Sequence, residues 1–509
     1  MSRIFNFKFS ILKEKFGWVL FSGFVLTLVY FLLRVINLTT LPVFADEAIY
    51  IRWSQVMKAE ATLRFLPLSD GKQPLFMWLM IPFFSFFHDP LFAGRMVSVL
   101  AGFGTLIGIF ILGLLLFRSK PIAFLSSLLY AVVPFAVFFD RLSLVDSLLA
   151  MFGVWTFLLG VLQVRYRRID LAMVAGFVMG GALLTKSPAM FFILLLPFTA
   201  LLLDFKSKKW KTQLIKLAGL WLISYFFAFA IYNILRLGPN FQMIGSRNQD
   251  YVFSFREVLS HPLNPFMPHV GQVWEWLWSF LGLPLILTFF GGVILGLKKL
   301  DRKIFLLLFW FLIPFLIQMA IAKVFTARYI FFTVPYLLLI ASFFVVSLKR
   351  IKFLMIIVIA AIIVPSLWFN YFLLTSPQKA PLPADERRGY LEEWTSGYGI
   401  AQVRDYLRNY PTDKQIIVGT EGSFGTLPDG LQIYFDKDQR VTIIGVGLGL
   451  DQISNQLLDS VNAGNPTFLV ANKSRIKNSD PRLKLISAYP KAESAKNHDS
   501  LLFYKVEEK

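Results

Sequence analysis

Residues 91–117, LFAGRMVSVLAGFGTLIGIFILGLLLF, form an apolar run that contains a single charged side chain, Arg95. An α-helix rises about 1.5 Å per residue, so a run of this length can cross a bilayer core of about 30 Å. Ten further apolar runs, most of roughly 20 residues, lie at 17–38, 121–139, 143–164, 171–186, 188–204, 214–236, 274–297, 304–322, 329–348 and 353–374. The sequence therefore predicts a polytopic α-helical membrane protein with about 11 transmembrane helices.

The composition supports this class of protein. Of the 509 residues, 56% are hydrophobic and 17% are aromatic, and the mean hydropathy is +0.62, whereas soluble domains are about 45–50% apolar. A soluble chain of this length would form roughly three domains, which the apolar runs exclude. The absence of cysteine excludes disulfides and thiol catalysis.

The distribution of charge indicates membrane topology rather than a nucleic-acid partner. The net charge is +20, from 51 basic and 31 acidic residues, yet residues 375–509 hold 17 of each. Clusters of Lys and Arg follow alternate apolar runs, and with the N-terminal arm these segments hold 21 basic and 4 acidic residues. The positive-inside rule makes them cytoplasmic. We therefore expect the lipid bilayer, and no nucleic acid, as a partner.

One apolar segment, 74–87, is short and bounded by proline. If it crossed the membrane, the basic cluster after residue 117 would lie outside and the alternation of charge would break. We therefore interpret it as a half-inserted or surface helix. The first run, 17–38, lacks a small-residue cleavage site and is interpreted as an uncleaved anchor. This topology places the N-terminus in the cytoplasm and the C-terminal segment outside an integral cell membrane.

Two domains are expected. Residues 1–374 form the transmembrane domain, with large external loops at 39–90 and 237–273, and residues 375–509 form a soluble extracytoplasmic α/β domain. The expected helices of the second domain are Ile400–Asn409, Leu427–Phe435 and Ile453–Val461, and its expected strands are Gln415–Val418, Val441–Ile444, Thr467–Val470 and Leu501–Val506. Residues 376–398, which are rich in proline and charge, form the linker between the domains.

Charged side chains beside the apolar runs are the candidate functional residues. Asp46 and Glu47 begin an amphipathic stretch of the first external loop, which is typical of a helix in the plane of the membrane interface. Adjacent residues of a helix point about 100° apart, so the two carboxylates would have different roles. One could abstract a proton while the other binds a metal or a hydroxyl. The alternative interpretation is that carboxylates simply favour the free N–H groups at a helix N-terminus.

Other candidates lie at further external ends of the runs. Lys72, Arg34 and Arg95 could be functional cations, or could be long side chains that snorkel to the membrane surface. Asp146 lies just inside an apolar run, where an ionisable group costs several kcal/mol unless it is paired or hydrated. An ion pair between Asp146 and Arg141 is the structural alternative.

Lys186, in the sequence LTKSP, and the pair Arg328-Tyr329 mark two more external junctions, where each cation could also serve only as a membrane anchor. Two acidic sites and four or five cations thus map to one face of the bundle, and no comparable acidic site occurs on the other. This pattern predicts an outward-facing polar cavity that holds an anionic ligand.

Other functional signatures are absent from the sequence. It contains no P-loop, no GxSxG and no HExxH motif, and its four histidines argue against a His-rich metal site. A transporter or flippase of a lipid-linked or anionic substrate is the leading alternative to an enzyme, and a binding or scaffold protein is another. A transporter predicts internal repeats and charges near mid-membrane. We find no repeat, and the charges gather at one face.

A set of these motifs resembles the GT-C membrane glycosyltransferases, in particular the branch of the protein O-mannosyltransferases and the aminoarabinose-lipid A transferases. The motifs are Asp46-Glu47, Lys72-Gln73-Pro74-Leu75, Arg95, Asp146, Leu184-Thr185-Lys186-Ser187-Pro188 and Arg328-Tyr329. The family commonly has Lys-Pro-Pro and Lys-Gly-Pro at the second and fifth of these, and neither departure removes a charged group. The resemblance covers roughly residues 17–350, so residues 1–374 would be the catalytic domain.

The resemblance implies an inverting glycosyltransferase that moves a hexosyl or pentosyl group from a polyprenyl-phosphate sugar donor to an acceptor hydroxyl of a protein, lipid or glycan. A phosphate leaves as an anion and needs no general acid, but it needs cations that stabilise the developing charge. Lys72, Arg328 and Lys186 are the candidates. A base must take the proton of the acceptor. We expect Asp46 to be this base, with Glu47 positioning the acceptor or a divalent ion.

The remaining candidates have supporting roles in this hypothesis. Asp146 would orient Lys72 or complete the sugar or metal site, and Tyr329 would be a supporting residue of that site. Arg95 and Arg34 would hold the loop carboxylates in place. A divalent cation, Mg²⁺ or Mn²⁺, is the expected candidate cofactor, with Asp46, Glu47 and Asp146 as candidate ligands, and no nucleotide or redox cofactor is expected.

Overall fold

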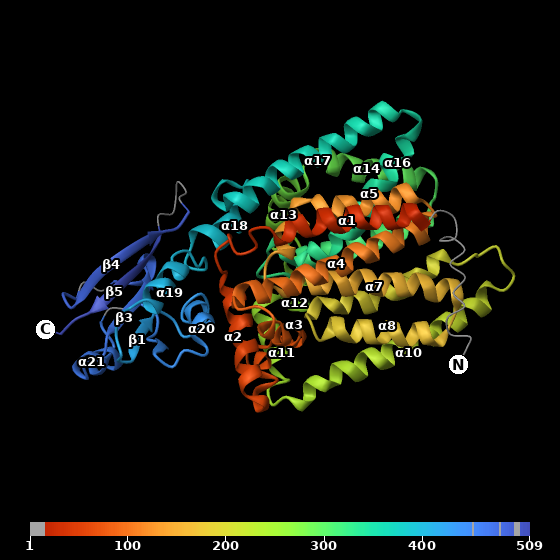
Figure 1. Cartoon of the computed structure of the whole chain (residues 1–509). Coiled ribbons are helices and arrows are strands. Elements are labelled where there is room, and N and C mark those ends of the chain that lie inside the picture. Colours follow the sequence, from red (N-terminus) through yellow and green to blue (C-terminus); the bar gives the residue numbers. More distant parts are fainter. Residues whose placement is uncertain (1–15, 450–451, 478–479, 493–498, 509) are drawn as a thin grey trace.

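The computed structural model describes residues 16–449, 452–477, 480–492 and 499–508, and shows a bundle of long helices with a small sheet at one end (Figure 1). The N-terminal arm, which the charge analysis assigns to the cytoplasm, lies largely outside the described residues. The helices of the bundle are α1 (Phe16–Val35), α4 (Pro90–Phe117), α5 (Lys120–Val132), α6 (Pro134–Asp140), α7 (Val145–Tyr166), α8 (Ile169–Leu183), α9 (Met190–Leu195), α10 (Trp210–Tyr232), α14 (Leu283–Lys298), α15 (Arg302–Ile321), α16 (Val334–Ser347) and α17 (Lys352–Thr375). The predicted class, a polytopic helical membrane protein with a C-terminal α/β domain, is confirmed.

The helices that could cross a membrane agree in position with most of the predicted runs. Within the described residues, six helices are long and apolar enough to span a bilayer, and the number is up to eight if each of two bent pairs is one span. Shorter apolar helices lie at Leu20–Val35, Leu75–Ser85, Ile169–Leu183 and Ser187–Leu202. The count of eleven spans, which needs three of these four, remains a prediction.

Two predicted spans are not single straight helices. The run 121–139 bends by 59° between α5 and α6, and the run 274–297 lies across a bend of 107° between α13 (Phe266–Leu281) and α14. Pro134 begins α6 and cannot donate a backbone hydrogen bond, so α5 ends there. At the second bend Gly282 has a φ of +74°, which favours glycine, and Pro284 follows in the first turn of α14. Hydropathy reports the apolar length of a run but not its direction, so it did not predict either bend.

Short helices cover the end of the bundle that faces the sheet (Figure 1). They are α2 (Ala45–Ala59), α3 (Leu75–Met80), α11 (Met243–Tyr251), α12 (Phe255–Ser260), α13 and α18 (Ala384–Arg387). The predicted amphipathic helix is α2. It runs across the bundle end with the C-terminal domain on its other side, where Gln55 Nε2 donates to the Ile433 carbonyl at 2.8 Å.

The C-terminal domain is a five-stranded sheet with helices on both faces. Its strands are β1 (Ile416–Thr420), β2 (Val441–Gly445), β3 (Thr467–Asn472), β4 (Leu483–Pro490) and β5 (Ser500–Val506), in the order β2-β1-β3-β5-β4. The first three strands are parallel, and β5 is antiparallel to both β3 and β4. Its helices are α19 (Ile400–Arg408), α20 (Asp429–Phe435) and α21 (Asn455–Asn462).

The predicted helices and four of the five strands of this domain agree with the structure to within a few residues. The sequence analysis missed β4, an edge strand whose side chains do not alternate cleanly between buried and exposed. Its pairing with β5 also shifts register between Leu485 and Ser487, which disrupts the two-residue period that marks a strand. One hydrophobic core extends from the bundle into this domain, which fixes the domain against the bundle end.

Candidate functional site

Asp46 and Arg328 form an ion pair at the bundle end that α2 crosses. Asp46 Oδ2 lies 2.7 Å from Arg328 Nη1, and the two side chains remain 25% and 16% exposed. Asp46 is in the first turn of α2, where free backbone N–H groups favour a carboxylate. Burial raises the pKa of Asp46, but the charges of Arg328 and Lys72 offset this, so the pKa lies below the usual aspartate value. Asp46 is therefore an ionised carboxylate at neutral pH.

Three of the predicted cations line one small cavity. Lys72, Lys186 and Arg328 come from distant parts of the sequence and surround a space of about 40 Å³. The other lining residues are Tyr50, Gln73, Val145, Thr185 and Tyr329. A cavity lined by three cations and by hydrogen-bonding side chains can hold an oxyanion, because each cation stabilises the negative charge at short range.

Local hydrogen bonds bring the segments of Lys72 and Lys186 together. Gln73 Nε2 donates to Ser187 Oγ at 2.9 Å, and the N–H of Leu75 donates to the Leu184 carbonyl at 3.1 Å. Lys72 directly precedes Gln73 and Lys186 directly precedes Ser187, so this hydrogen bond joins the neighbours of the two lysines. The two short motifs KQPL and LTKSP are therefore neighbours in space.

Each lysine of the cavity also has a partner within the protein. Lys72 Nζ donates to Tyr251 Oη at 3.1 Å. Lys186 Nζ donates to Asp146 Oδ1 at 2.6 Å and lies 4.3 Å from the centre of the Tyr329 ring. Asp146 was expected to orient Lys72 or to complete the sugar or metal site, with Arg141 as the structural alternative. In the structure its cationic partner is Lys186 and not Lys72, and Arg141 donates instead to backbone carbonyls at the end of α1.

A larger apolar cavity adjoins the cationic one. It has a volume of about 410 Å³ and shares Lys72, Gln73, Lys186 and Tyr329 with the smaller cavity. Its remaining wall is mainly apolar and includes Met190, Phe191, Leu194, Ile317, Ile321 and Val324. The two cavities together form a site with a cationic end and an apolar continuation, which suits an amphiphile with an anionic head.

Glu47 supports the loop before α2 and does not line either cavity. It is fully buried, and Arg95 donates to it twice, at 2.8 Å from Nε and 2.7 Å from Nη2. The N–H groups of Phe44 and Ser143 donate to it as well, at 3.0 Å and 2.6 Å. Arg95 also donates to the carbonyls of the 38–42 segment. The expected pairing of Arg95 with a loop carboxylate is present. Glu47, which was expected to position the acceptor or a divalent ion, lines neither of the two cavities.

The residues do not fit the predicted divalent cation. Asp46, Glu47 and Asp146 are each paired with a different cation, Arg328, Arg95 and Lys186. Within the described residues, no group of three or more His, Asp or Glu side chains is placed to hold a metal ion. A metal ion bound by these carboxylates would have to displace an arginine or lysine that is already at hydrogen-bond distance.

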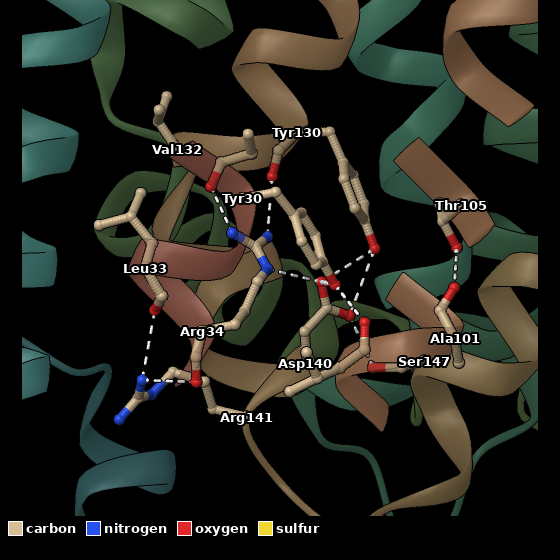
Figure 2. Close-up of polar contacts among 12 residues, drawn as sticks. Tyr30, Leu33, Arg34, Ala101, Thr105, Tyr130, Val132, Asp140, Arg141 and Ser147 are labelled. Carbon is tan, nitrogen blue, oxygen red and sulfur yellow. Dashed lines mark hydrogen bonds and ion pairs between the residues drawn. The ribbon is translucent and has the colours of Figure 1, made fainter. Parts of the chain in front are cut away.

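Arg34 belongs to a separate buried network within the bundle (Figure 2). Its Nε lies 3.2 Å from Asp140 Oδ2, and the hydroxyls of Tyr30, Tyr130 and Ser147 also donate to Asp140. The expectation that Arg34 holds the loop carboxylates is therefore wrong, because its guanidinium forms an ion pair with Asp140 instead.

The same network explains how the break before Pro134 is tolerated. Arg34 Nη2 donates at 3.0 Å to the Tyr130 carbonyl, which lies four residues before Pro134 and so lacks its usual helical donor. Arg141 similarly donates to carbonyls at the end of α1, including that of Arg34 at 2.8 Å. Both arginines stabilise helix ends inside the bundle.

Residues 376–398, expected to be a linker, contact the residues next to Asp46 and Arg328. The Tyr390 ring lies 4.3 Å from the ring of Phe44, two residues before Asp46. The N–H of Ala45 donates to the Thr395 carbonyl at 3.0 Å. Glu386 accepts a hydrogen bond from the N–H of Ala327 at 3.0 Å, beside Arg328, and burial raises the pKa of Glu386 to about 7. The segment expected to be a linker therefore packs against both partners of the central ion pair.

Sequence reasoning also missed Tyr50, Gln73, Arg247 and Tyr251. Arg247 and Tyr251 lie on α11 in the second large loop and line the apolar cavity. In a polar loop these residue types carry no signal of their own. Tyr50 follows Asp46 at a spacing of four residues, which places both on one side of α2, and this spacing could have singled it out.

Comparisons with known proteins agree with the fold. The family model described as dolichyl-phosphate-mannose-protein mannosyltransferase matches residues 71–232, a region that holds Lys72, Arg95, Asp146 and Lys186. None of the curated proteins matches the sequence. The predicted resemblance to the GT-C membrane glycosyltransferases is confirmed by this match and by solved structures with the same fold.

Three of these solved structures represent two proteins, one bacterial and one archaeal. ArnT from Cupriavidus metallidurans in the apo state superposes with a TM-score of 0.55 at 14% identity, covering 96% of this chain and 98% of ArnT. Its complex with undecaprenyl phosphate gives 0.52 at 14% identity, with the same coverage. The archaeal oligosaccharyltransferase AglB from Archaeoglobus fulgidus, in complex with an inhibitory peptide and a dolichol-phosphate, gives 0.51 at 12% identity, covering 90% of this chain and 70% of AglB.

Proposed function

We propose that this protein is an inverting glycosyltransferase that moves a sugar from a polyprenyl phosphate to an acceptor hydroxyl. The observation that carries the proposal is the junction of the two cavities, where Lys72 and Lys186 line both the cationic space and the apolar one. A polyprenyl phosphate has this pattern, since its anionic head joins directly to a long apolar tail. The match to a mannosyltransferase family model supports the same class of donor.

The cations act on the leaving group. As the bond between the anomeric carbon and the phosphate oxygen breaks, its electron pair goes to that oxygen, and negative charge grows on the phosphate. Lys72, Lys186 and Arg328 stabilise this charge in a site already arranged for it. The phosphate leaves as an anion, so no general acid is required.

Asp46 takes the proton of the acceptor hydroxyl as its oxygen attacks the anomeric carbon from the face opposite the phosphate, which inverts the configuration. Asp46 is paired with Arg328, and although burial raises its pKa, Arg328 and Lys72 lower it below the usual aspartate value. A base of low pKa is a weak base. The donor phosphate competes for the same two cations, so donor binding raises the proton affinity of Asp46. The base becomes effective only when the leaving group is in place.

The sugar lies between the phosphate and Asp46 in this proposal. Asp146 Oδ1 is paired with Lys186, but its buried Oδ2 has no hydrogen-bond partner. An unpaired buried carboxylate oxygen is costly, and a sugar hydroxyl would satisfy it. Asp146 thus positions Lys186 with one oxygen and contacts the sugar with the other. Glu47 and Arg95 are positioning residues, because they fix the loop that leads into Asp46.

The proposed topology follows from charge. The bundle end with Asp46 lies outside the cytoplasm, since the basic clusters lie at the opposite helix ends. Residues 1–374 form the catalytic domain in the cell membrane, and residues 375–509 form an extracytoplasmic domain that closes one side of the site.

The test uses the purified full-length protein with a radiolabelled polyprenyl-phosphate sugar in detergent or liposomes. We expect label to move to an added acceptor fraction of protein, lipid or glycan, and to do so in the native protein but not in the Asp46→Asn variant. The product should have inverted anomeric configuration. If label never leaves the polyprenyl carrier with any acceptor fraction, or if transfer retains the configuration, the proposal is wrong.

A further inference from the structure

A second polar cavity lies at the opposite end of the bundle from Asp46. It has a volume of about 600 Å³ and is formed where α4, α7 and α15 meet the loop after residue 202. The helices α4 and α7 carry Arg95 and Asp146 near their first residues and reach this cavity with their last ones. The full length of α7, about 33 Å at 1.5 Å per residue, therefore separates it from the candidate active site (Figure 1).

Cations from three helix ends surround this cavity. Arg118 ends α4, Arg165 and Arg167 end α7, and Lys303 begins α15. Asp204 is the one acidic residue of the lining, so the cavity has a net formal charge of +3. A basic end of a bundle is expected from topology alone, but four cations around a hollow, rather than along a loop, form an anion site.

Within the part of the chain that the structure describes, most of this charge has no acidic partner. Among the described residues, neither Arg118 nor Arg165 forms an ion pair, and Lys303 Nζ lies 3.7 Å from Asp301, beyond a normal hydrogen bond. Asp204 accepts a hydrogen bond from the N–H of Lys206 at 3.1 Å instead of pairing with a cation. Arg167 donates to the Val164 carbonyl at 3.1 Å and to Gln213 at 3.3 Å, which fixes its guanidinium at the rim.

The rest of the cavity lining is mainly apolar. It includes Leu115, Leu116, Phe117, Val161, Val164, Leu202 and Leu203. A free inorganic anion would gain nothing from these side chains. An amphiphile with a phosphate head and acyl chains would contact both the cations and the apolar side chains, and the cavity lies at helix ends, where lipid headgroups are found.

We propose that this cavity binds the phosphate headgroup of an anionic membrane phospholipid. The phosphate lies among Arg118, Arg165 and Lys303, and the acyl chains leave along the apolar side chains of α4 and α7. The site is distinct from the donor site, since no residue lines both. It is a structural lipid site that fixes the ends of three helices and the loop between them.

The test compares two variants that lose the same charge at the same end of the bundle. The first is Arg118→Gln/Arg165→Gln/Lys303→Gln, in the cavity. The matched control is Lys208→Gln/Lys209→Gln/Lys211→Gln, whose side chains are exposed and do not line it. Each full-length protein is purified in detergent, mixed with phosphatidylglycerol or phosphatidylcholine, and analysed by native mass spectrometry and thermal unfolding.

We expect the native protein and the control to retain phosphatidylglycerol and to unfold at a higher temperature with it, while the cavity variant retains it on the order of 100-fold more weakly. Equal loss in both variants would mean general attraction to a basic surface and would overturn the proposal. Stabilisation by inorganic phosphate equal to that by the lipid would overturn the lipid assignment. If the triple variant does not fold, Lys303→Gln alone should weaken lipid retention by about fivefold, and an unchanged value would overturn the proposal.

Discussion

The Asp46 carboxylate lies 2.7 Å from the Arg328 guanidinium, although 282 residues separate them in the sequence. Arg328 also lines the cavity proposed for the donor phosphate. The pair therefore links the proposed base to the proposed leaving-group site. Asp46→Asn keeps the shape of the side chain but removes its charge, so we expect transfer to fall by about 10²–10⁴-fold. Donor binding should be retained or tightened, because the Asp46 charge no longer competes with the phosphate for Arg328 and Lys72.

The control for this substitution is Glu60→Gln, an exposed carboxylate just after the same helix. It should leave transfer unchanged. Initial rates with a labelled donor, together with thermal unfolding of each variant, distinguish loss of the base from loss of the fold. A folded Asp46→Asn protein with native transfer rates would contradict the role of Asp46.

Lys72→Ala should weaken the use of the donor. Lys72 lines both cavities, and its pKa is raised by Tyr50 and Asp46 despite the opposing effect of burial, so it is charged at all relevant pH values. Loss of one charge-assisted contact with the phosphate should raise KM for the donor by about 10–100-fold. Lys58→Ala, on the exposed side of α2, is the matched control. An unchanged donor KM in Lys72→Ala would exclude its phosphate role.

The sequence predicted the charged members of the site because their setting made them conspicuous. Asp46, Lys72, Lys186 and Arg328 stand beside long apolar runs, where an ionisable side chain is costly and needs a partner or a function. Hydropathy and charge also predicted that these residues share one face. The structure places Lys72, Lys186 and Arg328 around one pair of cavities, and Asp46 forms an ion pair with Arg328 beside them.

The partners within this set could not be predicted from the sequence. Arg34 and Arg95 had the same apparent setting, yet Arg34 pairs with Asp140 and Arg95 with Glu47. The choice depends on how the helices pack and on which backbone carbonyls a break such as that before Pro134 leaves free. Periodicity contains neither piece of information.

The contact of the C-terminal domain with the site was hidden for a similar reason. Residues 376–398 have the composition of a linker, but Thr395 and Tyr390 contact the two residues before Asp46. Such contacts between segments some 350 residues apart are set by tertiary packing, and no local pattern marks them.

Glu47 and Arg95 should stabilise the protein as a unit. Both side chains are fully buried, so Glu47→Gln leaves Arg95 with an uncompensated charge. Breaking one partner of a buried ion pair costs about 3–5 kcal/mol, and we expect a marked fall in the unfolding temperature. The double variant Glu47→Gln/Arg95→Met should lose less stability than the sum of the single variants. Additive losses would mean that the two side chains act independently.

Glu386 should make the stability of the native protein depend on pH. Burial raises its pKa from the ordinary glutamate value to about 7 in the folded protein, so between these two values the folded state binds more protons than the unfolded state. The free energy of unfolding therefore increases as the pH falls from about 7 toward 4.5, and this contribution is absent above pH 7.

Glu386 accepts a hydrogen bond from the N–H of Ala327, so the effect acts on the contact between the C-terminal domain and the Arg328 segment. Glu386→Gln, which is permanently neutral, should remove this part of the pH dependence, whereas Glu393→Gln, at a partly exposed position three residues beyond Tyr390, should keep it. Unfolding temperatures of the three proteins measured from pH 5 to pH 8 check the prediction, and parallel curves for the native protein and Glu386→Gln would contradict it.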